Sequence, residues 1–258
     1  MGAQFWRISP LTSLLVFVSW PVTAGLQAQS TLVNIPDGTI LPVRLDQQIN
    51  SKNARPGQVI TARIMQDVPL PTAGKIPRGS VVSGNVVSSI PADQGQARIE
   101  FRFDTLEIHR RKTAIITNLR ALASPVEVNL AQVPETSPGF GTPWVWSTTR
   151  QIGGDEVYGR FGVVTDEFSQ QVGTSVADGV LAQPRSKPGS ACRGPIDGAN
   201  AVQAMWLFSS DACGVYGFEY LTIQHAGRSE PEGQVTLISN KGEVKLPTAS
   251  GMLLRVHH

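Results

Sequence analysis

The sequence has few of the side chains that form metal or cofactor sites. Its 258 residues include two cysteines and four histidines. His109 and His225 lie far apart in the chain, and His257 and His258 are adjacent at its end. Ligands of structural zinc usually recur as pairs at short, fixed spacings, and these histidines form no such cluster with each other or with cysteine. We therefore expect no metal site and no cofactor.

Motifs of common enzymes are missing as well. The chain has no G-x-S-x-G segment for a serine nucleophile, and Gly153-Gly154 lacks the context of a phosphate-binding loop. The adjacent carboxylates Asp155-Glu156 and Asp166-Glu167 would point to opposite faces of a strand or favour the start of a helix. They give little support to a two-carboxylate glycosidase site. We expect no catalytic residues.

The chain also lacks an excess of charge of one sign. Its 22 Lys and Arg residues nearly balance 20 Asp and Glu residues, which leaves a formal net charge of +2. Removal of a leader that contains Arg7 would lower this charge to +1. Such a balance gives no electrostatic reason to expect nucleic acid or an anionic membrane as a partner.

The first 24 residues have the pattern of a secretory signal peptide. Arg7 and the free amine precede an apolar segment, Leu11 to Trp20, and Val22-Thr23-Ala24 fits a signal-peptidase site, with cleavage after Ala28 as the alternative. A retained membrane anchor needs roughly 18 apolar residues or more, and this segment is much shorter. We expect an exported protein in the periplasm, on the outer membrane or outside the cell, with no transmembrane helix in the mature chain.

Cys192 and Cys213 are expected to form a disulfide bond. An even number of cysteines in an oxidising compartment favours a disulfide over a metal site or a reactive thiol. Closing the loop between them would stabilise the fold by roughly 3 kcal/mol in the chain-entropy model. The alternative is a nucleophile pair of Cys213 with His225, which would require Cys192 to stay reduced.

The first half of the chain has the pattern of short β-strands. Ile99, Phe101 and Phe103 alternate with charged residues, which is the period of a half-buried strand. The alternation slips at Asp104-Thr105 and indicates a β-bulge or a bend between sheets, and His109-Arg110-Arg111 lies at or near a turn. Short strands at this spacing predict a barrel or a sandwich. The expected strands are 39–45, 57–68, 80–90, 96–109 and 112–123.

The second half is richer in loops. Gly and Pro are frequent between residues 131 and 200. One helix is expected from Thr165 to Gly173, because Thr165 suits the N-cap and Asp166-Glu167 the first turn. Residues Met205 to Phe208 fit either a buried strand or a short buried helix. Further strands are expected at 235–238, 243–246 and 252–256.

The expected fold class is therefore all-β. A barrel-like or sandwich domain would span residues 31–125. A loop-rich, disulfide-stapled β region with at most one or two short helices would span residues 126–258 and pack on the first domain.

The segment from Gly38 to about Leu122 also contains an ordered series of short motifs. The motifs include Gly38-Thr39-Ile40-Leu41-Pro42, Ile49-Asn50-Ser51, Pro56-Gly57-Gln58-Val59, Ile76-Pro77-Arg78-Gly79-Ser80 and Gly95-Gln96-Ala97-Arg98-Ile99. In their order and spacing the segment resembles the β-barrel domain of the TrbI-like scaffold family, which spans the envelope in type IV secretion and conjugation machines. The resemblance implies a shared barrel fold in the cell envelope.

The chain departs from that family outside the matching third. Members of the family carry a cytoplasmic segment, a retained transmembrane helix and a proline-rich stalk, whereas this chain begins with a signal-like segment. His109-Arg110-Arg111 stands where the family has a Pro-Asp-Gly turn, and we find no convincing counterpart of the helical pair that forms the family's pore. The resemblance therefore does not imply a secretion channel.

A binding function fits the sequence better than a catalytic one. Trp144 and Trp146 are two residues apart in a Pro/Gly-rich stretch, and in an extended chain their rings would share one face that could stack on sugar rings or a partner protein. The alternative is that both rings plug the core. We expect a non-enzymatic structural or protein-interaction role in the envelope. A cell-wall or glycan-binding module is the alternative, followed by an envelope hydrolase or a cysteine enzyme.

Overall fold

A computed structural model of the protein describes residues 1–2, 35–71, 74–135, 148–159, 161–186, 189–190, 192 and 201–257. The chain divides into two units, Met1–Leu32 and Val33–His258. Nearly all of the described residues belong to the second unit, and most of the proposed signal peptide lies outside them. The described chain is mostly β-strand, which confirms the expected fold class.

The larger sheet has ten strands that come from both ends of the second unit. They are β1 (Ile40–Leu45), β3 (Val59–Ile64), β6 (Val81–Ile90), β7 (Arg98–Ile108), β8 (Arg111–Ala114), β9 (Ile116–Ala123), β16 (Gly214–Tyr216), β17 (Leu221–His225), β18 (Gln234–Ser239) and β20 (Gly251–His257). Their order is β16-β9-β20-β1-β3-β6-β7-β18-β17, and β8 pairs with β7. The sheet is open and does not close into a barrel. Of the two predicted architectures, the structure therefore has the sandwich-like one.

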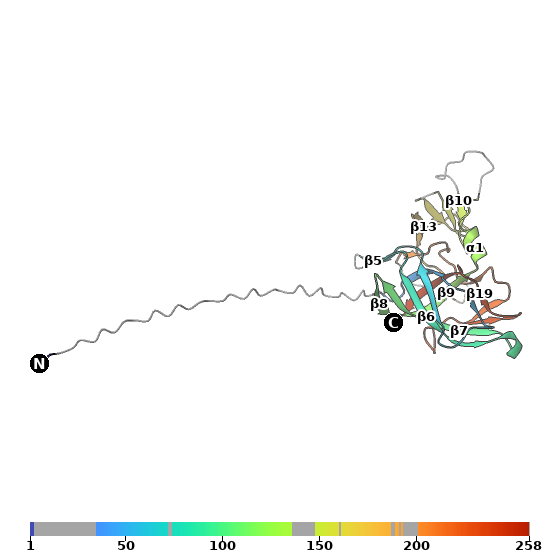
Figure 1. The fold of residues 1–258 in the computed structure, drawn as a ribbon. Helices are drawn as coiled ribbons and strands as arrows, with labels where there is room; N and C mark the ends of the chain where they lie inside the picture. Colours follow the sequence, from blue (N-terminus) through green and yellow to red (C-terminus); the bar gives the residue numbers. More distant parts are fainter. Residues whose placement is uncertain are drawn as a thin grey trace. The chain divides into compact units, whose positions relative to one another are not determined.

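A second sheet has six strands in sequence order. They are β10 (Thr148–Arg150), β11 (Glu156–Tyr158), β12 (Val163–Thr165), β13 (Gln171–Val176), β14 (Gly179–Ala182) and β15 (Gln203–Ala204). Two short ladders pair β2 (Ile49–Asn50) with β19 (Lys245–Leu246), and β4 (Val68–Leu70) with β5 (Gly74–Ile76). The described helices are α1 (Pro125–Leu130), which follows β9 directly, and a 3-10 turn, Ala92–Gln94. Figure 1 shows α1 beside β10 of the second sheet.

The predicted irregularity in the long strand is a β-bulge. Ser83 of β6 pairs with Thr105 of β7, and the next residue, Gly84, pairs with Phe103. Asp104 is therefore the extra residue of β7, as the slip in the hydrophobic alternation indicated.

The core forms two clusters of buried side chains. The first lies against the larger sheet and includes Ile99, Phe101 and Phe103. In the second, Ile40 and Leu253 of the larger sheet join side chains of the six-stranded sheet and of the chain that follows it. The alternating strands thus bury apolar groups on both sides of β1 and β20. The other members of the second cluster include Val164, Val180, Trp206 and Phe208.

The helix expected from Thr165 to Gly173 is wrong. The segment instead contains the turn between β12 and β13. Asp166 Oδ1 accepts hydrogen bonds from the backbone N–H groups of Phe168 and Gln170, at 3.0 and 2.9 Å. The carboxylate assigned to a helix N-terminus closes a turn instead, because Asp side chains serve both purposes.

The helix that does form, α1, begins at a different cap. Ser124 is its N-cap, Pro125 occupies the first turn, and Ser124 Oγ accepts a 3.3 Å hydrogen bond from the backbone N–H of Glu127. This order of Ser, Pro and Glu is a recognised helix-start pattern. This pattern can be read in the sequence. The residues on either side of it are apolar, however, so the hydrophobic pattern alone does not show where the strand ends and the helix begins.

Candidate functional site

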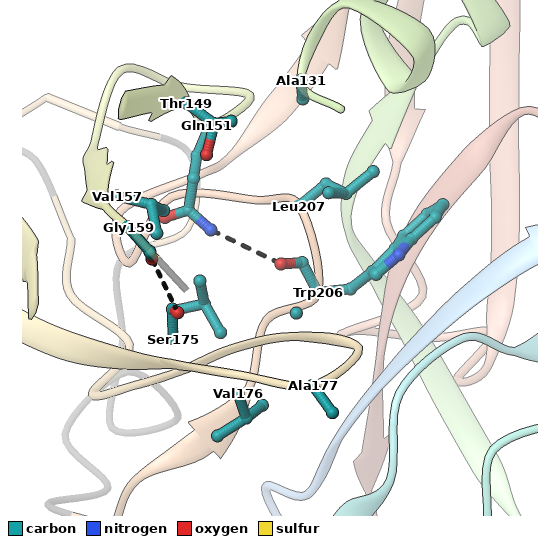
Figure 2. A pocket seen from close by; sticks show the side chains of 12 residues that line it. Ala131, Thr149, Gln151, Val157, Gly159, Ser175, Val176, Ala177, Trp206 and Leu207 are labelled. Atoms are coloured by element: carbon teal, nitrogen blue, oxygen red, sulfur yellow. Dashed lines mark hydrogen bonds between the residues drawn. The ribbon is translucent and has the colours of Figure 1, made fainter. Parts of the chain in front are cut away.

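A pocket of about 610 Å³ opens between the six-stranded sheet, the turn after α1 and the segment around Trp206 (Figure 2). Its volume is in the range of small-molecule sites, roughly 300–1,000 Å³. The residues that line it are mostly small or apolar, and none of those described carries a charge. The larger apolar side chains among them belong to Val157, Val176, Val180, Trp206 and Leu207.

Gln151 contributes the most unusual polar group of the pocket. Its side chain is 5% exposed. Its Nε2 donates a long, 3.5 Å hydrogen bond to the carbonyl oxygen of Trp206, while its Oε1 has no hydrogen-bond partner in the described part of the chain (Figure 2). The large majority of buried polar atoms are paired. The Oε1 atom is enclosed by the protein as well as unpaired, so it is a local cost to stability and not a contact that is open to a ligand.

Ser175 is the second polar side chain of the pocket with defined hydrogen bonds. Its Oγ accepts a 2.8 Å hydrogen bond from the backbone N–H of Phe161 and donates a 3.3 Å bond to the carbonyl oxygen of Gly159 (Figure 2). Both bonds fix the connection between β11 and β12. The hydroxyl therefore holds the pocket wall in place.

The segment from Met205 to Phe208 is neither the strand nor the helix that its apolar residues suggested. It is a tight turn, closed by a 2.9 Å hydrogen bond from the Phe208 N–H to the Met205 carbonyl. Trp206 has a positive φ of 52° within it, which is uncommon for a non-glycine residue. The expected burial of Trp206 in the core is confirmed.

Gly179 permits the close approach of the β13–β14 hairpin to this turn. A Cβ atom at Gly179 would lie 2.6 Å from Cα of Trp206 and 2.5 Å from Oε1 of Gln66. Only glycine fits such a contact without movement of the neighbouring backbone.

A smaller groove of about 340 Å³ adjoins the pocket on the side of α1, and the two share Ala131 and Gln151. Three exposed apolar side chains lie on α1 and just after it: Val126, Leu130 and Val133, at 64%, 61% and 59% exposure. We call these three residues the α1 apolar patch. Leu130 and Val133 also line the groove, together with the charged residues Glu127, Glu135 and Arg150.

The disulfide between Cys192 and Cys213 is formed, with 6.0 Å between the two Cα atoms. It uses both cysteines of the sequence. No thiol is left for a nucleophile pair with His225, whose Nδ1 lies 2.7 Å from the carbonyl oxygen of Gln234. The expected covalent bond is therefore present, and it joins the loop after β14 to the start of β16.

Asp155 is a buried carboxylate near the disulfide loop. Its Oδ2 accepts a 2.7 Å hydrogen bond from the Ser210 N–H, and its own N–H donates a 2.9 Å bond to Ser209 Oγ. Burial raises the pKa of Asp155 above its ordinary value, and the hydrogen bonds from Ser210 only partly oppose this effect. Within the described residues, no group of three or more metal-binding side chains occurs near Asp155 or elsewhere.

The pocket residues were not among the candidates from the sequence. The predicted binding residues Trp144 and Trp146 lie outside the described residues. No helix in the described part of the chain is both long and apolar enough to cross a membrane. A comparison with models of protein families finds no match, and a search of curated proteins finds no match either.

Proposed function

We propose that this chain is an exported protein of the cell envelope that binds a partner protein and has a structural rather than a catalytic role. The α1 apolar patch carries the proposal. Exposed apolar groups that gather next to a groove are typical of interaction sites, and Leu130 and Val133 belong to both features.

The surroundings of the patch suit a protein partner. Glu127, Glu135 and Arg150 border the groove with charges of both signs. An apolar centre with a polar, charged rim is the usual anatomy of a protein–protein interface. A partner that presents apolar side chains at its centre and both signs of charge at its edge would complement this surface.

Export is supported by two independent features. The first 24 residues have the order of charge, apolar segment and small residues of a secretory signal. The bond between Cys192 and Cys213 is of a kind that persists in oxidising compartments. The resemblance of residues 38–122 to the TrbI-like domain fits the same compartment, and we propose a shared origin of this part without a secretion channel.

The experiment combines localisation with partner capture. The full chain with a C-terminal tag is expressed in a bacterial host, and the periplasmic, membrane and cytoplasmic fractions are compared after thiol labelling without reductant. We expect the processed chain outside the cytoplasm and no labelled thiol. Full-length chain in the cytoplasm with two free thiols would contradict export.

The binding role is tested by chemical crosslinking in the envelope. The double variant Val126→Glu and Leu130→Glu should lose a crosslinked species that the parent chain forms, because carboxylates at the centre of the interface would remain without partners. The matched control is Val59→Glu, since Val59 is equally exposed at 64% but lies on β3. Equal crosslinking by the double variant and the control would exclude the patch.

Glycan binding is the second candidate. The exposed aromatic rings of Tyr158 and Phe161, at the end of the β11–β12 hairpin, favour it, since aromatic faces are suitable platforms for stacking. Cosedimentation with insoluble cell wall is the test. Binding that is lost in Tyr158→Ala with Phe161→Ala, and kept in Val126→Glu with Leu130→Glu, would favour the glycan over the protein partner.

A further inference from the structure

We propose that the tip of the β7–β8 hairpin binds the phosphate headgroups of an anionic lipid membrane. The tip consists of His109-Arg110-Arg111-Lys112, which we call the basic tip, and all four side chains are exposed. The charges of the whole chain nearly balance, so an attraction to anions has to come from a local surplus such as this one. The site does not depend on the α1 apolar patch or on a partner protein.

The positive charges of the basic tip are not neutralised by ion pairs. Within the part of the chain that the structure describes, Arg110, Arg111 and Lys112 form no ion pair with an acidic side chain. The acidic residue closest to the tip along the hairpin is Glu107, which lies directly opposite Lys112. Three basic side chains beside this one carboxylate leave the end of the hairpin with a positive surplus that is open to an external anion.

The turn holds its basic residues in an unfavourable conformation. His109 and Arg110 have φ values of 48° and 67°, and they connect Ile108 directly to its partner Arg111. Asn-Gly is the preferred pair for such a turn, because larger L side chains are strained at positive φ. A more stable turn would therefore have neither of these side chains. Residues that break a local rule in this way indicate a function.

Protection of a sheet edge explains only part of the basic tip. Charged side chains on an edge strand prevent its pairing with another chain. Among the described strands β8 pairs with β7 alone, so Arg111 and Lys112 suit this purpose. His109 and Arg110 lie in the turn and not in the strand, so edge protection gives no reason for them.

Basic side chains continue from the hairpin across the larger sheet. Directly paired residues of antiparallel strands lie on the same face. Arg44 and Arg63 are exposed in the row that leads to the tip, and Asp46 pairs with Arg63 at 3.2 Å. The row thus adds cations to the same face. Its members, in order of pairing, are Lys112, Glu107, Val81, Arg63 and Arg44.

This chemistry fits lipid phosphates better than a protein. A protein interface usually has an apolar centre, and none of the four residues of the basic tip is apolar. An array of phosphates needs only accessible cations, as in polybasic segments that bind anionic membranes. The choice of lipid over nucleic acid rests on the proposed export, because lipid headgroups are the phosphates of the envelope.

The test is cosedimentation of the full, disulfide-bonded chain with lipid vesicles. Vesicles of phosphatidylethanolamine with phosphatidylglycerol are compared with vesicles of phosphatidylcholine alone. We expect stronger binding to the anionic vesicles, and this excess should decline as salt is added. Each Lys or Arg near such a surface strengthens binding about fivefold. The variant Arg110→Gln with Arg111→Gln and Lys112→Gln should therefore weaken it about 100-fold.

The matched control is Lys52→Gln with Arg55→Gln and Lys245→Gln. It removes the same charge from exposed sites. Ser89 Oγ donates a 2.9 Å hydrogen bond to the carbonyl oxygen of Ser51, which places the control sites at the end of β6 that is remote from the basic tip. The control should bind as the parent chain does. The first 24 residues are common to all variants, so an apolar leader cannot cause a difference between them.

A second variant separates binding from folding. His109→Asn with Arg110→Gly supplies the preferred turn residues, so it should raise the urea midpoint of unfolding and still bind anionic vesicles about fivefold more weakly. A gain in stability with a loss of binding cannot come from misfolding.

Four results would overturn the proposal. The parent chain might show no preference for anionic vesicles, or the triple variant might bind them as tightly as its control. The turn variant might bind as tightly as the parent chain. Finally, tighter binding to a DNA duplex than to the vesicles, or release from the vesicles by glycerol phosphate at constant ionic strength, would assign the basic tip to a phosphate other than that of a membrane. These results do not depend on where the chain is located in the cell, so they are distinct from a failure of export.

Discussion

Oε1 of Gln66 accepts a 2.6 Å hydrogen bond from the backbone N–H of Trp206, a residue 140 positions later in the chain. Nε2 of the same side chain donates a 3.0 Å bond to the carbonyl oxygen of Val180. The Gln66 side chain is 1% exposed. One buried amide after β3 therefore joins the β13–β14 hairpin to the turn that forms the pocket.

Replacement of this amide by an apolar group should destabilise the fold. In Gln66→Leu the Trp206 N–H loses its acceptor in a buried site, whereas the Val180 carbonyl keeps a 2.9 Å bond from the Met205 N–H. An unpaired buried donor costs about 1–3 kcal/mol, and we expect the free energy of unfolding, measured with urea, to fall by this amount. Gln171→Leu at an exposed site should change it by less than about 0.5 kcal/mol. Equal values for the two variants would contradict the role of Gln66.

The bulge in β7 predicts a strong requirement for glycine on the facing strand. A Cβ atom at Gly84 would lie 1.8 Å from the carbonyl oxygen of Arg102, so Gly84→Ala requires the two strands to separate. Overpacking of this kind costs about 1–3 kcal/mol, which should appear as a lower midpoint of denaturant unfolding. The control is Gly74→Ala, because no atom lies within 4 Å of a Cβ at Gly74. A midpoint of Gly84→Ala equal to that of the control would show that the bulge is not rigid.

The elements that could be predicted well from the sequence are those whose pattern involves only residues close together in the chain. Ile99, Phe101 and Phe103 alternate over successive residues, and this alternation was sufficient to define β7 and its bulge. The turn after β7 contains His109 and Arg110, which have positive φ values of 48° and 67°. Positive φ at two successive residues is typical of a two-residue hairpin turn whose twist matches the strands.

The order of strands and the pocket have no such local signal. β16, β18 and β20 come from the last part of the chain and pair with β9, β7 and β1, and no spacing in the sequence indicates which strands meet. The pocket has a similar origin, because Gln151 follows β10 and Trp206 follows β15, and the β-bridge between Ile152 and Phe208 brings these distant segments together. A polar residue in a loop-rich segment gives no indication that its side chain is buried.

The disulfide should contribute to the stability of the folded chain. The closed loop spans a sequence separation of 21 residues, for which the chain-entropy model predicts about 3 kcal/mol. We expect Cys192→Ala with Cys213→Ala to lower the free energy of unfolding by this order. Dithiothreitol should destabilise the parent chain and have no effect on the double variant. If the reductant destabilised both proteins equally, its effect would not arise from this bond.

Because the carboxyl group of Asp155 is buried, we expect its contribution to the free energy of unfolding to depend on pH. Burial raises its pKa in the folded state above the unfolded value of about 4, so the folded protein binds this proton more tightly. The contribution of Asp155 to stability is therefore most favourable at acidic pH and declines as the pH rises above about 4. Asp155→Asn cannot ionise and retains an oxygen that accepts from the Ser210 N–H. We expect the stability of the parent chain relative to this variant to decrease between pH 4 and pH 7 in urea titrations.

Asp67 provides the opposite case in the same molecule. A 2.5 Å hydrogen bond from Lys75, followed by a 2.8 Å bond from the Arg78 N–H, lowers the pKa of Asp67. Because the folded state then favours the carboxylate, the stability of the parent chain relative to Asp67→Asn should increase as the pH rises toward 7. The effect is smaller, since the pair with Lys75 is exposed to solvent. Parallel pH trends for the two variants would show that Asp155 is not governed by burial, because burial and ion pairing shift a carboxyl pKa in opposite directions.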